Sequence, residues 1–230
     1  MTTVNCRIEA ILTVKAEAQG TVIANFALQH MKAAVTFRDH VVAIESEHLS
    51  EPFGSFFENI RSYGSGCIMS AAASLEALIN EFFIAPSGPL RHLFADFDAE
   101  FWGTGRFERK PPLAKYQEAL KMLRLPEFEE RSPIYKEVDA LFQLRNTLVH
   151  YKPTWDPDRQ TKVSMIEVLS GKYELSPFID SGADFVTMRS MSASCMNWVV
   201  ATTLRFMREF HERTHMDDKK MSSFWSLAAP

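Results

Sequence analysis

The stretch that decides the fold of this chain closes a helix built to face a core, and it reads Arg145-Asn146-Thr147-Leu148-Val149-His150-Tyr151-Lys152-Pro153. The apolar residues before and within it recur at helical spacing and form one stripe: Ile134, Val138, Leu141, Phe142, Leu148 and Val149. At about 100° per residue, Arg145 falls near the centre of that stripe. A charge left unpaired there is costly, so Arg145 must be paired or used for function.

Apolar residues at helical spacing predict further helices along the chain. We expect helices over residues 21–47, 56–86, 112–123, 133–151 and 187–213. Two points stay open. The second helix is either continuous or broken at residues 62–66, and residues 162–174 form either a helix or a short hairpin. Residues 87–111 read as a long connection rich in Gly, Pro and aromatic residues. The pattern indicates an all-α bundle of four to five long helices with irregular insertions.

Length and composition indicate one folded domain. The chain has 230 residues, of which 46% are hydrophobic, which is enough to bury a full core. We expect an N-terminal extension over residues 1–20, a helical domain over 21–213 and a loose tail over 214–230. The net charge of −4 excludes a global basic field that would steer the chain onto nucleic acid. Any RNA contact must therefore come from a local patch.

The cysteines and the chain start indicate a cytoplasmic protein. Cys6, Cys67 and Cys195 are odd in number and widely spaced, so we expect small buried thiols in a reducing compartment, with no zinc or redox pair. The first residues show no signal peptide, and no segment approaches about 20 apolar residues, so no membrane association is expected.

Three pieces of sequence, in order, resemble the HEPN superfamily (higher eukaryotes and prokaryotes nucleotide-binding). Its mark is an arginine followed, after four to six residues, by a histidine, and here four residues separate Arg145 from His150. The first intervening residue, Asn146, is polar, as in many active members. The three pieces are Ser74 to Glu81, Leu144 to Pro153, and Cys195 to Trp198. The resemblance covers roughly residues 20–213 and implies a HEPN-like helical bundle.

The resemblance implies a metal-independent endoribonuclease that acts as a symmetric homodimer, with both Arg-x4-His segments in one cleft. His150 would take the 2′-hydroxyl proton of RNA, since an imidazole exchanges protons near neutral pH. Arg145 would stabilise the charge on phosphorus, and Asn146 would orient the ring or the phosphate. Lys152 and Tyr151 would contact the substrate. The product would be a 2′,3′-cyclic phosphate, and the reaction would need no cofactor or metal. The protein would be a toxin or defence effector that an antitoxin or regulatory protein restrains.

A structural role for the same residues stays open. Glu76 and Asn80 lie one turn apart on the edge of the second helix's apolar stripe. They could hold Arg145 in a buried ion pair, with Asn146 completing a polar network. The protein would then be a non-catalytic dimerisation or nucleotide- or RNA-binding module, and Arg145 would fix the register of two helices.

Other signals favour simpler interpretations. Residues 211–215 match the zinc motif HExxH, but charged Arg213 lies inside it and the helix is ending, so we expect a solvated helix end without metal. His30, His40 and His48 do not share one helix face, which favours surface or satisfied core histidines. Asp96, Asp98 and Glu100 read as a solvated acidic loop. The methionines and Trp198 of the last helix read as core.

Overall fold

The computed structural model describes residues 26–84, 109–152, 163–216 and 218–228, and every regular element in these ranges is a helix. The all-α prediction is therefore confirmed. In chain order the elements are α1 (Phe26–His48), α2 (Phe56–Ile84), α4 (Pro112–Met122), α5 (Pro133–Val149), α6 (Val163–Leu169), η3 (Phe185–Arg189), α7 (Ala193–Thr214), α8 (Asp218–Trp225) and η4 (Ser226–Ala228).

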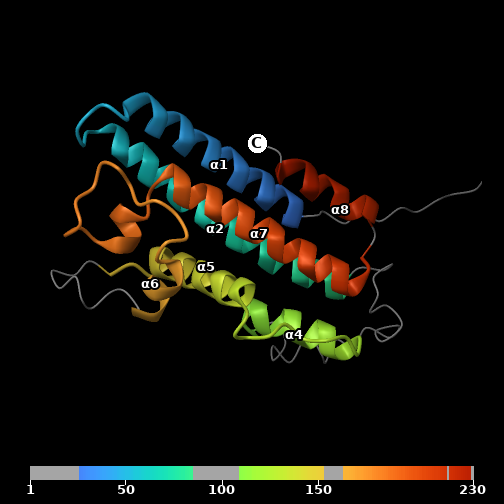
Figure 1. Ribbon diagram of the computed structural model, residues 1–230. Helices are drawn as coiled ribbons and strands as arrows, with labels where there is room; N and C mark the ends of the chain where they lie inside the picture. Colours follow the sequence, from blue (N-terminus) through green and yellow to red (C-terminus); the bar gives the residue numbers. More distant parts are fainter. Residues whose placement is uncertain (1–25, 85–108, 153–162, 217, 229–230) are drawn as a thin grey trace, which may run out of the picture.

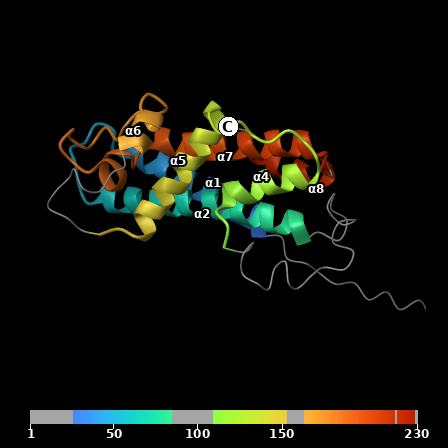
Figure 2. The same ribbon diagram turned by 90° about the horizontal axis from the view of Figure 1, so that it is seen from below.

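Three long helices, α1, α2 and α7, run side by side and form the body of the molecule (Figure 1). The shorter α5 crosses obliquely over α2 and α7, and α4 contacts the same two helices further along (Figure 2). The core lies between these helices and is filled by apolar side chains that are fully or almost fully buried, among them Met31, Ile68, Leu75, Leu141, Met196 and Phe206. The expectation that Trp198, Met188, Met191 and Met196 belong to the core is confirmed: Met188 is partly buried against the core, and the other three are buried. Among the described helices, none is long and apolar enough to cross a membrane.

Helix α2 is continuous, which settles the open question of a break at residues 62–66. Its two glycines lie where neighbouring side chains come close. A Cβ atom on Gly64 would lie 2.9 Å from Sδ of Met191, and one on Gly66 would lie 3.0 Å from the ring of Phe37. These glycines therefore serve close packing against α1 and the residues just before α7, and not a change of chain direction.

Helix α7 begins later than the periodicity predicts. Residues 185–189 form a separate turn, η3, in which Asp184 accepts hydrogen bonds from the backbone N–H and the hydroxyl of Thr187. Ser192 then caps α7 by accepting from the N–H of Cys195 at 3.0 Å. The predicted start at residue 187 is wrong because two successive caps interrupt one apolar face. Of the two possibilities for residues 162–174, the helix is found, as α6.

The prediction of a loose tail beyond residue 214 is wrong for the residues described. The chain turns at His215, which has a left-handed backbone conformation (φ 50°), and continues into α8. Met221 and Phe224, three residues apart on α8, are fully buried. The polar residues at the start of α8 suggest a solvated segment, but its second half carries an apolar face that packs on α1 and α7.

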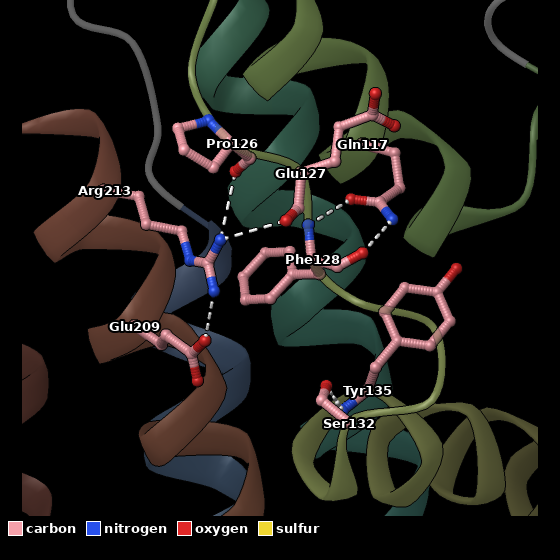
Figure 3. A network of polar contacts seen from close by, with 8 residues as sticks. All are labelled: Gln117, Pro126, Glu127, Phe128, Ser132, Tyr135, Glu209 and Arg213. Carbon is pink, nitrogen blue, oxygen red and sulfur yellow. Dashed lines mark hydrogen bonds and ion pairs between the residues drawn. The ribbon is translucent and has the colours of Figure 1, made fainter.

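The connection between α4 and α5 is held by a polar network (Figure 3). Gln117 of α4 exchanges two hydrogen bonds of 2.8 Å with the backbone N–H and carbonyl of Phe128. From α7, Arg213 donates to the carbonyls of Pro126 and Glu127 at 3.0 and 3.1 Å. Its guanidinium lies 4.3 Å from the centre of the Phe128 ring. This network fixes where α5 begins, and therefore where its far end lies.

Candidate functional site

Helix α5 has a defined start and end. Pro133 occupies its first turn, and the side chain of Ser132 accepts from the N–H of Tyr135 at 3.4 Å. The helix ends at Val149, after which the N–H of His150 donates to the carbonyl of Asn146 at 2.9 Å. The predicted span of residues 133–151 agrees with this to within two residues. The Arg-x4-His motif thus occupies the last turn and cap of α5.

Arg145 is paired with Glu76 of α2. Its Nη2 atom lies 3.2 Å from Oε2 of Glu76, and the two side chains are 27% and 40% exposed. The prediction that Arg145 lies at the centre of a buried stripe is wrong, because its long side chain carries the guanidinium to the edge of the α2–α5 interface. The pairing with Glu76 matches the structural alternative, but the pair is open to solvent instead of sealed in the core.

Asn80 does not support Arg145. Its side-chain oxygen accepts from Nζ of Lys115 on α4, at 2.9 Å. Lys115 is only 1% exposed, so this contact places a polar acceptor beside a buried lysine. The proposed network of Arg145 with both Glu76 and Asn80 therefore reduces to Glu76 alone. The spacing of Glu76 and Asn80 indicates one helix edge, but α4 and α5 cover different parts of that edge.

The remaining motif residues lie at the surface. Asn146, Val149, His150, Tyr151 and Lys152 are all exposed, and together they form what we term the α5 end surface. Within the described part of the chain, no contact joins Arg145 to His150. One copy of the chain therefore presents the arginine and the histidine to solvent as separate groups.

A shallow groove of about 190 Å³ adjoins the α5 end surface. It is lined by Leu148 and Tyr151, by Arg61, Ser65 and Met69 of α2, and by Thr187 and Met191. Arg61 is exposed and was not among the residues that the sequence motif singles out. Its spacing of four and eight residues from Ser65 and Met69 marks one face of α2, but only the packing of α5 shows that this face meets Tyr151.

The two histidines of the HExxH motif lie in different surroundings. His211 is 9% exposed and packs beside Trp225 of α8, with ring centres 5.8 Å apart, whereas His215 is exposed. No cluster of three potential ligands occurs among the described residues. The expectation of a solvated helix end is wrong for His211, because α8 covers it.

The described cysteines are buried thiols, as the sequence predicts. Cys67 and Cys195 are free and fully buried, and burial raises the pKa of Cys195 to about 12 and that of Cys67 well above its usual value. The third cysteine, Cys6, lies outside the described residues, as do Asp96, Asp98 and Glu100.

The three histidines of α1 and its end rest against aromatic rings. The rings of His40 and Tyr63 stack with centres 4.6 Å apart, and those of His48 and Phe56 with centres 4.2 Å apart. His30 lies beside Phe26 at 5.9 Å. These contacts agree with the expectation of surface or satisfied histidines.

Comparison of the chain with protein-family models, curated proteins and solved structures found no match. The HEPN resemblance therefore rests on the residues of the motif and their order in the chain.

Proposed function

We propose that this protein is a metal-independent endoribonuclease of the HEPN type that cleaves RNA as a homodimer. The observation that supports this most directly is the exposure of His150 together with Asn146, Tyr151 and Lys152, at the end of a helix whose start is firmly anchored. A histidine that must take a proton from a bound polymer needs an accessible ring on a rigid element.

The chemistry follows from the residue types. His150 takes the proton of the 2′-hydroxyl, and the oxygen attacks the adjacent phosphorus. The bond from phosphorus to the 5′-oxygen breaks, the leaving oxygen takes up a proton, and a 2′,3′-cyclic phosphate remains. Arg145 stabilises the added negative charge with its planar fork of N–H donors.

Arg145 is able to leave Glu76 for a phosphate at small cost. An ion pair as exposed as this one contributes between about 0 and 1 kcal/mol. A phosphate then replaces the carboxylate as hydrogen-bond acceptor. Arg61, exposed on the groove beside Tyr151, adds a second positive charge along the path of the RNA backbone. Tyr151 offers a ring on which a base can stack.

A second copy completes the site in this proposal. Arg145 and His150 lie on different sides of the last turn of α5 and make no contact within one chain. A two-fold axis beside the α5 end surface brings Arg145 of one copy towards His150 of the other. Such an enzyme damages its own cell when unrestrained, so we place it among toxins or defence effectors that a partner protein holds in check.

The test is cleavage of single-stranded RNA by the purified full-length chain in EDTA. We expect a 2′,3′-cyclic phosphate product, no cleavage of the same sequence made with 2′-deoxyribose, and loss of cleavage in His150→Ala. His215→Ala is the matched control, because His215 is also an exposed histidine that follows a helix end. Cleavage that survives in His150→Ala, or that needs added metal, contradicts the proposal.

The dimer is tested by mixing two inactive variants, Arg145→Ala and His150→Ala. If each site takes its arginine from one copy and its histidine from the other, half of the re-formed dimers regain one intact site. About a quarter of the parent activity then returns. No recovery, with exchange of subunits shown by mass, contradicts the composite site.

The ion pair of Arg145 with Glu76 favours a second candidate, a non-catalytic dimerisation or nucleotide- or RNA-binding module. There, Arg145 fixes the register of α2 and α5. This candidate requires no RNA cleavage by the parent protein and a loss of several kcal/mol of stability in Arg145→Ala.

A further inference from the structure

A second groove is lined by three arginines of α1 and α7. It has a volume of about 610 Å³ and lies between α1 and α7. Its lining consists of Arg38, Asn197, Val200, Ala201, Leu204, Arg205 and Arg208. Among the described residues that line it none is acidic, although the chain as a whole carries a net charge of −4. The groove is therefore a local concentration of positive charge.

Two of the arginines are held in place by contacts that leave donors available. The guanidinium of Arg208 lies 4.9 Å from the centre of the Trp225 ring, and stacking of this kind leaves the N–H groups at its edge able to donate. Arg38 is 17% exposed and donates through Nε to Asp39 at 2.7 Å. Asp39 is 62% exposed, so the pair is weakly held and its carboxylate faces water.

The third arginine shares its partner. Arg205 pairs with the buried carboxylate of Glu137, which also accepts from Nζ of Lys172 at 2.7 Å. One carboxylate thus serves two cations, and the side chain of Arg205 is still 56% exposed. Its positive charge at the groove is only partly neutralised.

The floor of the groove is apolar. Val200 and Leu204 are 3% and 4% exposed and lie one turn apart on α7, with exposed Ala201 between them. Volumes of about 300 to 1,000 Å³, with an apolar lining and a few polar groups, are typical of sites for small molecules. Guanidinium groups match the geometry of phosphate oxygens.

We propose that the groove between α1 and α7 binds a small phosphorylated molecule, with its phosphate on Arg38, Arg205 and Arg208 and its apolar body on Val200 and Leu204. This site uses no residue of the α5 end surface. The proposal for this groove therefore does not depend on the ribonuclease proposal.

The probe is phenyl phosphate, titrated into the full-length protein by calorimetry, with inorganic phosphate and phenol as comparisons. We expect phenyl phosphate to bind more tightly than either, because only it meets both the arginines and the apolar floor. The double variant Arg38→Gln with Arg208→Gln is expected to bind phenyl phosphate at least about tenfold more weakly, since each charge-assisted hydrogen bond contributes that order of affinity. Arg205 is kept, because its loss also leaves Glu137 with one partner fewer.

Three controls keep the result interpretable. Ala201→Glu places a carboxylate in the groove at an exposed position, and it abolishes binding while thermal stability stays at the parent value. Arg131→Gln, an exposed arginine before α5, and Arg61→Gln, beside the α5 end surface, leave the affinity unchanged. Failure of phenyl phosphate to bind at millimolar concentration overturns the proposal. Binding of phenyl phosphate that is weakened neither in the double variant nor in Ala201→Glu overturns it as well.

Discussion

Arg145 and Glu76 form an ion pair across the α2–α5 interface, with 3.2 Å between Nη2 and Oε2, and both side chains remain accessible to water. The arginine that the sequence places on an apolar face is thus satisfied without being enclosed. This geometry leaves it stable in the free protein and available to an anionic ligand.

Arg145→Ala is expected to lower the free energy of unfolding by less than about 1 kcal/mol, because exposed ion pairs contribute little and Glu76 returns to water. Urea denaturation at low and high salt measures this. Glu76→Gln is the matched variant from the other side and should have an effect of the same size. A loss of several kcal/mol in Arg145→Ala contradicts this prediction and favours the structural role.

Glu137→Gln is expected to cost more, about 1 to 3 kcal/mol, because Glu137 is only 4% exposed and its carboxylate binds both Lys172 and Arg205. A neutral amide keeps the shape, but it removes the negative charge and turns an NH2 group towards one of the two cations. Glu76→Gln under the same denaturation conditions is the comparison, because Glu76 is more exposed and pairs with Arg145 alone among the ion pairs described. An equal loss of unfolding free energy in Glu137→Gln and Glu76→Gln contradicts this prediction.

Arg213→Lys is expected to destabilise the protein by about 1 to 3 kcal/mol although the charge is kept. The lysine cannot donate at once to the carbonyls of Pro126 and Glu127 and cover the ring of Phe128 (Figure 3). Thermal denaturation followed by circular dichroism measures the change. Arg131→Lys, at an exposed position nearby in sequence, should stay within about 0.5 kcal/mol of the parent.

Glu45 gives the protein a defined pH dependence. Burial raises the pKa of its carboxyl, and the backbone N–H of Ala193, which donates to it at 2.9 Å, offsets this only in part. The carboxyl of Glu45 therefore binds its proton more tightly in the folded state than in the unfolded chain. The contribution of Glu45 to stability falls as pH rises from below the usual carboxyl value of about 4.3 through the raised one.

Glu45→Gln removes this titration but keeps an oxygen for the N–H of Ala193. We expect the stability of the variant relative to the parent to increase between about pH 4 and pH 7, as measured by urea denaturation at each pH. Glu47→Gln, at an exposed position on the same helix, should show no such slope. A difference that is flat or falls with pH contradicts the assignment.

Much of the fold is predictable because helix signals are local. The apolar stripe from Ile134 to Val149 and the Ser132–Pro133 start define α5 without reference to any other part of the chain. The later start of α7 was missed because Ser192 interrupts an apolar face that continues into η3. Helix α8 was missed because the buried residues Met221 and Phe224 follow a strongly polar segment.

The candidate site, too, was predictable only where the signal is local to one helix. The sequence by itself determined that Arg145, Asn146 and His150 close a helix, and that Glu76 lies on the edge of another. Only the tertiary structure decided that Glu76 takes Arg145 while Asn80 takes Lys115, that Arg61 meets Tyr151, and that Arg38 shares a groove with Arg205 and Arg208. The reason is physical: helical periodicity gives the face on which a side chain lies, whereas packing between helices distant in sequence determines what that face meets.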